Sequence, residues 1–516
     1  MRVRYAFDPY NWATITPLYA ALREAPLSSD TFSEWLGAWN ALDRAVHDAW
    51  TWLKRPAYYD TRDYAAERAY QTFTEHMFST YLGLRDSLIR RALAVQAEPP
   101  APEHRQLWRC WHNQVALFDP SSVELQAEIS RLEGRYREIM RCYDGAPDAP
   151  FAYWTERRAE LNELMMRLLR LRRQLARTGG MDTFLQYRWR ELDRLDYNIA
   201  DCQAFHHAVE RVVVPAVLRL RALTTGDDEI PELADPEVLA AGNEGILGSV
   251  DVTFGDLFHR MRDGYIDLGY RPGKANASEA WFFPNTGMPY LHVASTSPPN
   301  VLHESGHGLH AYLSFRAQRY LWNVGGPEEF QEFAAIALDM LCWPWYDQSR
   351  GGLYTARESA AARRGVLRFY LEEMANSVLQ DAFEHWVYGE APDDVAPGDL
   401  DSKWFELRQR FMPWNTFASD EEAATGWQRW KWSLFRIPLY MITYPTAIVA
   451  TCQLGRWAAT DRASAVQHYI SALSLGNTEP LPALFRHAGV TFPFTGEAVT
   501  QAVDYVFDQW PGRSND

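Results

Sequence analysis

Two histidines and a glutamate within residues 303–307 form the clearest chemical pattern in the sequence. The segment reads HESGH, which places His303 and His307 four positions apart. On an α-helix, residues four apart lie on one face, so both imidazoles can bind the same metal ion. Glu304 would then stand beside a water molecule on that ion and could take a proton from it. The pattern predicts a zinc site that hydrolyses peptide bonds, with Glu304 as the general base.

A third metal ligand is expected in the segment that follows. The metzincin pattern requires a glycine and a third histidine where this chain has His310 and Leu313, so that class is excluded. The segment PEEFQEFAAIALDML reads as a helix and offers Glu328, Glu329 and Glu332. The first two lie in its first turn, where carboxylates suit the helix dipole, whereas Glu332 adjoins the apolar face. Glu332 is therefore the expected third ligand, and one Zn²⁺ per chain is the expected cofactor.

Histidines outside this motif are not expected to bind the metal, and His206 and His207 are expected to be surface or core residues. His206 and His207 are adjacent on a predicted helix and cannot share an ion as the HESGH pair does. His292, His310 and His385 lie near segments of interest, and a supporting or packing role is expected for each.

Composition limits the classes of partner. With 51 basic and 67 acidic residues, the net charge is −16, which argues against nucleic-acid and anionic-membrane partners. Five widely spaced cysteines without a CxxC pair argue against a disulfide framework and favour a reducing compartment. The first residues show no apolar signal segment, and no run of about 18 apolar residues occurs. We therefore expect no membrane span and a cytoplasmic location.

Helical periodicity dominates the sequence. Leucines recur at spacings of three and four from Leu161 to Leu175, which marks one buried helix face. The best strand is Met288–Ala294, which follows the turn-like sequence PNTG. The 516 residues predict two domains or one large helical body with a cleft. We divide them into an N-terminal helical region, residues 1–195, and a catalytic zinc peptidase region, residues 196–516.

The chain resembles the thimet oligopeptidase and oligoendopeptidase F family of zinc peptidases, and is nearer to the oligoendopeptidase F branch. HESGHGLHAY matches the HExGH block of that family, and FQEFAAIAL places Glu332 at its spacing for the third ligand. Further similar blocks are DLGYRPGKA, MPYLHVA, DAFEHWVY and RIPLYMITY. The likeness covers nearly the whole chain.

The resemblance implies a mostly α fold, with two helical lobes around a deep cleft and a small β-sheet beside the HESGH helix. It implies short unfolded peptides as substrates, because long chains cannot enter the cleft. The chain departs from the family in three places. The segment after GKA reads NASEA where relatives are glycine-rich, Ser433 stands where a histidine is usual, and the stretch from Cys142 to Trp154 is short.

Two tyrosines and one strand are the remaining candidates for catalysis and binding. Tyr440 and Tyr444 are one helical turn apart and, by the resemblance, match tyrosines of the C-terminal block of the family. We expect Tyr444 to donate to the oxyanion, with Tyr440 as its neighbour; two core tyrosines are the alternative. The predicted strand, which resembles the family's edge strand, could pair with a substrate backbone. Its binding residues would be Met288, Pro289, Tyr290, Leu291 and His292.

Three other functions stay open at this point. A helical metallocarboxypeptidase also uses HExxH with a later glutamate, and would need a pocket for a free C-terminus. An inactive relative would bind peptides or keep zinc as a structural ion, an alternative that Ser433 favours slightly. A helical scaffold with a chance HESGH is disfavoured by the flanking blocks. The sequence leaves cleavage preference and oligomeric state open.

Overall fold

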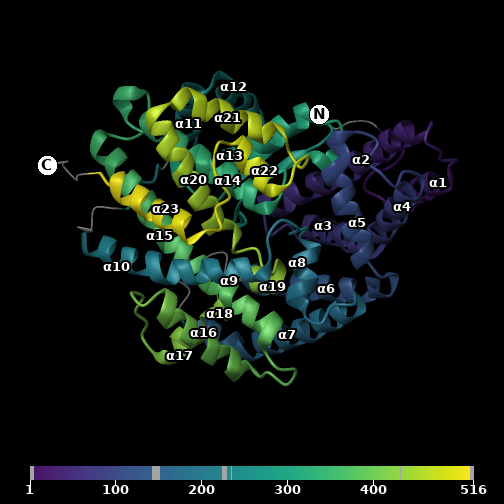
Figure 1. Ribbon diagram of the computed structural model, residues 1–516, viewed down its shortest axis with the longest axis horizontal. Helices are drawn as coiled ribbons and strands as arrows, with labels where there is room; N and C mark the ends of the chain where they lie inside the picture. Colours follow the sequence, from purple (N-terminus) through teal and green to yellow (C-terminus); the bar gives the residue numbers. More distant parts are fainter. Residues whose placement is uncertain (1–4, 142–150, 224–228, 234, 430–431, 512–516) are drawn as a thin grey trace.

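The computed structural model describes residues 5–141, 151–223, 229–233, 235–429 and 432–511, which form a mostly helical molecule with one small sheet (Figure 1). This architecture confirms the predicted fold class. The loop predicted at residues 143–150 lies outside the described residues.

The first helices build a separate aromatic core. They are α1 (Trp12–Glu24), α2 (Phe32–Tyr59), α3 (Tyr64–His76), α4 (Leu82–Val95) and α5 (Arg105–Leu117). Trp39 and Trp111 stack in this core with ring centroids 5.3 Å apart, and Trp35 and Trp108 pack against them. Aromatic rings bury large apolar areas, so this cluster holds the N-terminal helices together.

The remaining helices share a second, larger core. They are α6 (Val123–Arg141), α7 (Phe151–Thr178), α8 (Phe184–Glu191), α9 (Ile199–Ala208), α10 (Val214–Leu223), α11 (Pro236–Val250), α12 (Val252–Met261), α13 (Pro298–Ala317), α14 (Glu328–Cys342), α15 (Ala356–His385), α16 (Pro397–Phe411), α17 (Asp420–Ala424), α18 (Gly426–Arg429), α19 (Trp432–Arg436), α20 (Thr443–Thr460), α21 (Arg462–Ser474), α22 (Leu481–His487) and α23 (Gly496–Asp508). Its buried side chains run from Leu117 to Trp510. Over the first helices the two cores divide between Trp111 and Leu117, but Tyr320, from much later in the chain, also packs in the N-terminal core. The domain division at residue 195 remains a prediction.

The sheet has three strands in the order β1-β3-β2. They are β1 (Ile266–Leu268), β2 (Ser278–Phe283) and β3 (Met288–Val293). Leu291 in β3 lies opposite Ile266 in a parallel pair and opposite Ala280 in an antiparallel pair. The backbone of β3 is therefore paired on both sides, and the expectation that this strand is an edge open to substrate is wrong. The edges are β1 and β2.

Polar contacts hold the sheet at both ends. Gly287 has φ 65°, a left-handed value that suits glycine, and lies in the turn that joins β2 to β3. Lys274, from the GKA block, is buried and donates to the carbonyls of Asp267, Gly269 and Val293 at 2.8–2.9 Å. This lysine therefore joins the carboxyl ends of β1 and β3 to the loop that precedes β2.

A glycine lets the two helices of the HESGH region approach closely. A Cβ on Gly306 would lie 2.5 Å from Cα of Ala335 and 2.7 Å from the carbonyl oxygen of Ala334. Both atoms belong to the backbone of α14, so only glycine permits this contact. Glu332 precedes Ala335 by one helical turn, and the close contact therefore brings its carboxylate towards α13.

Candidate active site

The residues predicted to bind metal converge between α13 and α14. Glu332 Oε2 lies 3.6 Å from His303 Nε2 and 3.7 Å from His307 Nε2. A tetrahedral zinc ion with bonds of about 2.0–2.2 Å separates its ligand atoms by roughly 3.3–3.6 Å. Glu332 is 2% exposed, and its Oε2 atom has no hydrogen-bond partner among the described residues. The spacing and this unsatisfied oxygen both suit a divalent cation.

Burial sets the charge of these ligands in the metal-free protein. It lowers the pKa of His303 to about 4 and that of His307 well below its usual value, so both imidazoles are neutral and keep a free lone pair. Burial also raises the pKa of Glu332 to about 8, although the hydrogen bond from Tyr440 opposes this. A cation between the three side chains would favour the carboxylate form of Glu332.

Glu304 lies beside the ligands with its carboxylate enclosed. Burial, with the charges of Glu332 and Glu279, raises the pKa of Glu304 well above its usual value, and a hydrogen bond with the backbone of Ala280 opposes this. Its Oε2 atom has no hydrogen-bond partner in the described parts of the chain. A buried carboxylate with one free oxygen and a raised pKa is well suited to accept a proton.

The two candidate tyrosines lie together, although not on one helix. Tyr440 precedes α20, whereas Tyr444 is in its first turn, and the rings stand 73° apart with centroids 5.7 Å apart. The expectation that they are one helical turn apart is therefore wrong, but their proximity holds. The Tyr440 hydroxyl donates to Glu332 Oε1. Burial raises the pKa of both phenols well above the usual value, so both keep their proton.

A cavity of about 790 Å³ adjoins this group of residues. His303 of α13 and Tyr444 of α20 line it, together with residues of α14, α15 and α16. Phe369 and Ile448 contribute apolar surface, and Asn376 contributes an amide. A space of this size can take several side chains of an extended peptide beside the candidate metal ligands.

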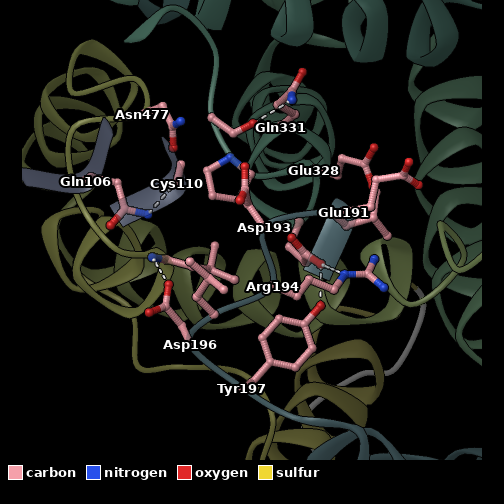
Figure 2. A pocket seen from close by; sticks show the side chains of 16 residues that line it. Gln106, Cys110, Glu191, Asp193, Arg194, Asp196, Tyr197, Glu328, Gln331 and Asn477 are labelled. Carbon is pink, nitrogen blue, oxygen red and sulfur yellow. Dashed lines mark hydrogen bonds and ion pairs between the residues drawn. The ribbon is translucent and has the colours of Figure 1, made fainter. Parts of the chain in front are cut away.

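The other two glutamates of α14 face a different pocket. This pocket, of about 300 Å³, is lined by α5, the segment from Glu191 to Tyr197 and the start of α14 (Figure 2). Glu329 forms an ion pair with Arg194, with Nε and Oε1 2.9 Å apart, and also accepts from the Tyr197 hydroxyl. Glu328 lines the same pocket. Among the three candidates, only Glu332 approaches the two histidines.

The remaining candidates occupy supporting positions. His292 is buried in β3, with Nε2 3.0 Å from the Ala275 carbonyl oxygen, and His310 packs on Phe330. Ser433 is buried and donates to Glu384 at 3.0 Å, so this hydroxyl supports α15 rather than the candidate ligands. The predicted strand residues Met288–His292 are mostly buried within the central strand.

Sequence reasoning missed the contribution of β2. Its Ala280 backbone contacts Glu304, and Glu279 pairs with the buried Lys54 of α2. Burial lowers the pKa of this lysine, whereas the negative charge of Glu279 raises it, and the net effect is an increase. The only hint in the sequence was the alternation of SEAWFF after the GKA block.

Two further expectations concern cysteines and membranes. Cys110, Cys202, Cys342 and Cys452 are buried free thiols, and Cys142 lies outside the described residues. Among the helices in the described ranges, none combines the length and apolar character that a membrane crossing requires.

Comparisons place the chain among peptidases. Residues 251–503 match the family model described as Peptidase family M3. Pz peptidase A, solved with an inhibitor, aligns with a TM-score of 0.88 at 17% identity, over 98% of each chain. A structure assigned as oligoendopeptidase F aligns with a TM-score of 0.86 at 20% identity, over 99% of this chain and 98% of that one. Another with that assignment, from Bacillus anthracis str. Ames, gives 0.85 at 15% identity, over 98% and 97%. Comparison with curated proteins gives no significant match. At these identities, the structural likeness establishes the fold.

Proposed function

We propose that this chain, a metallopeptidase that matches Peptidase family M3 over residues 251–503, is a zinc-dependent endopeptidase that cleaves internal bonds of short unfolded peptides. One observation carries the proposal. His303, His307 and the buried Glu332 bring three ligand atoms together, with the enclosed Glu304 carboxylate beside them. This set provides for both a metal and a base, whereas a purely structural ion would not need the base.

The proposed roles divide between the metal ligands and Glu304. When bound by His303, His307 and Glu332, zinc would act as a Lewis acid and lower the pKa of a coordinated water. Glu304 would accept a proton from the attacking water and pass it to the leaving amine. Tyr440 would hold the Glu332 carboxylate through its hydrogen bond.

Tyr444 is the proposed donor to the oxyanion. It lines the cavity beside His303, and burial keeps its phenol protonated, so its O–H group could exchange its hydrogen bond with Tyr440 for one to the substrate carbonyl as negative charge develops there. The hydroxyl of Tyr440 is already engaged by Glu332, which favours Tyr444 for this role.

The sheet suggests where an extended substrate would lie. In the described residues, β2 pairs only with β3, so its other edge faces away from the sheet. Towards Phe283 this edge is covered by α2, because the Thr51 hydroxyl donates to the Phe282 carbonyl. The contact between Ala280 and Glu304 places the Ser278–Ala280 portion next to the active site. We propose this portion of β2, in place of β3, as the strand that pairs with the substrate backbone.

Cleavage of defined peptides tests the proposal. A quenched fluorescent peptide of roughly ten residues, long enough to lie extended in a cleft, should be cut internally by the zinc-loaded protein. Blocking its C-terminus as an amide should leave cleavage intact, whereas a carboxypeptidase would lose its substrate. Folded proteins should resist digestion. Release of single C-terminal residues alone would support the metallocarboxypeptidase alternative, and no cleavage by the zinc-loaded protein would support an inactive relative.

A further inference from the structure

A second group of metal-binding side chains lies between α9 and α15, which pack against each other (Figure 1). Cys202 on α9 and Asp381 and His385 on α15 each offer a ligand atom, and these atoms lie within 4.8 Å of one another. The three side chains belong to the interior, with exposures of 0%, 0% and 3%. They stand on different helices from the proposed catalytic ligands.

Two polar atoms of this group lack partners. Within the described residues, Oδ1 of Asp381 and Nδ1 of His385 make no hydrogen bond, whereas Nε2 of His385 lies 3.3 Å from Asp381 Oδ2. The second oxygen of Asp381, Oδ2, is 2.7 Å from His206 Nε2, which fixes the carboxylate and leaves Oδ1 free. An unsatisfied buried polar group costs about 1–3 kcal/mol. Two such atoms at one place, Asp381 Oδ1 and His385 Nδ1, point to a ligand that would satisfy them.

The donor set is that of a borderline divalent cation. A thiolate, a carboxylate and an imidazole are the three ligand types that zinc binds. Asp381 and His385 are four residues apart on α15, so they present their ligand atoms from one face of the helix. Burial lowers the pKa of His385 to about 4, which keeps its ring neutral as a metal ligand requires.

The surrounding charges are also compatible with a cation. Arg194 is buried near the group, and its charge is offset by the ion pair with Glu329 (Figure 2). A Cys202 thiolate and the Asp381 carboxylate would then supply two negative charges, which a divalent ion balances. Without the ion, burial and Asp381 raise the pKa of the Cys202 thiol, and it stays protonated.

We infer that Cys202, Asp381 and His385 bind a zinc ion that joins α9 to α15 and has a structural role. His206 orients Asp381 for this ion, as a hydrogen bond to a ligating carboxylate commonly does. The enclosed position separates the ion from substrate, so its role is to hold the core together. The inference is independent of the proposed peptidase mechanism, because the two sites share no residue.

Cobalt substitution tests the second site without any mutation. The proposed catalytic ligands are two imidazoles and a carboxylate, so only the second site can give a thiolate-to-cobalt charge-transfer band in the near ultraviolet. The chelator-treated full-length protein, refilled with Co²⁺, should show this band at a stoichiometry of one per chain. A protein that takes up cobalt at the catalytic ligands but shows no such band would overturn the inference.

Variants then assign the band to its ligand. In His303→Ala/His307→Ala, which removes the catalytic pair, metal analysis should still find one zinc per chain, and the cobalt band should remain. Cys202→Ala should abolish the band and lower the zinc content by one ion. Cys452→Ala, at another buried free thiol on α20, is the matched control and should leave both unchanged. Zinc lost from the double-histidine variant, or a band that survives Cys202→Ala, would contradict the assignment.

Discussion

Replacing Gly306 by alanine should disturb the proposed metal site although the residue binds nothing itself. The added Cβ would lie 2.5 Å from Cα of Ala335 in α14. Carbon atoms ordinarily approach to about 3.5–4.0 Å, so the α14 backbone would have to retreat by about 1 Å. Backbone cannot swing aside as a flexible side chain can, and the retreat would carry Glu332 with it.

The structure sets the size of the two expected effects of Gly306→Ala, on zinc affinity and on folding stability. Functional groups must stay within about 0.5 Å of their productive positions, so the shift should weaken zinc binding by about tenfold or more. Overpacking a close contact costs about 1–3 kcal/mol, partly offset by the better helix propensity of alanine, which contributes about 1 kcal/mol. Gly37→Ala is the matched control, because no atom lies within 4 Å of the Cβ that would be added to this helical glycine. This variant should gain only the stabilisation from the better helix propensity of alanine.

Two measurements on the same preparations test this reasoning. Chelator competition gives the zinc affinity of wild type, Gly306→Ala and Gly37→Ala. Urea unfolding of the metal-free proteins gives their stabilities, and the two variants should differ by the overpacking cost of about 1–3 kcal/mol. Gly37→Ala should bind zinc as wild type does. If Gly306→Ala keeps wild-type zinc affinity and matches the control in stability, then the packing of α13 against α14 does not require a glycine at this position.

Four further outcomes are expected. Glu304→Gln should retain zinc by metal analysis but lose about 10²–10⁴ in peptide cleavage rate; unchanged activity would refute its role as base. Glu332→Ala should weaken zinc affinity more than Glu329→Ala in the same chelator assay, because only the former approaches the histidines; the reverse order would mean that the ligand is wrongly assigned. Tyr444→Phe should lower kcat by about 10²–10³ with little change in KM, and an effect on KM alone would indicate a binding role. The lysine of α2 and other contacts hold the folded pKa of Glu279 at about 2, below its usual 4.5, so its ion pair stabilises the fold above about pH 4.5 and this contribution is lost as pH falls towards 2. The stability difference between wild type and Glu279→Gln in urea should shrink over that range, and a difference independent of pH would show that the ion pair is not formed.

The sequence predicted those parts of the site that depend on local helical spacing. His303 and His307 come together because four residues complete about one turn, and a helix that begins at the right place is sufficient for this. Glu332 was distinguished from Glu329 by its apolar neighbours, which show the inward face of a helix. The structure places the Glu332 carboxylate near both imidazoles.

Features that depend on contacts between distant segments could not be predicted from local spacing in the sequence. The strand around Leu291 was recognised, but its central place in the sheet depends on β1 and β2, and only β-pairing geometry decides the order. The relation of Tyr440 to Tyr444 was also misjudged, because the chain turns before α20 begins. His385 was expected to pack, and its partners Cys202 and Asp381 could not be found without knowing that α9 lies against α15.

The N-terminal helices and the region that holds the proposed active site have separate apolar cores, but β2 links the two regions. Several side chains of α2 contact the hairpin. Among them, Arg44 donates to the Pro284 carbonyl, Thr51 donates to the Phe282 carbonyl, and the lysine one turn further pairs with Glu279. Ala280, the neighbour of Glu279 on this strand, contacts Glu304 through its backbone. Any movement of α2 relative to the larger core must therefore either break this partly buried ion pair or displace the edge of β2 that adjoins the proposed base. Breaking the pair would leave the charge of the buried lysine uncompensated, which favours displacement of the strand. The aromatic N-terminal core thus influences the position of the proposed substrate strand without contributing a residue to the proposed chemistry.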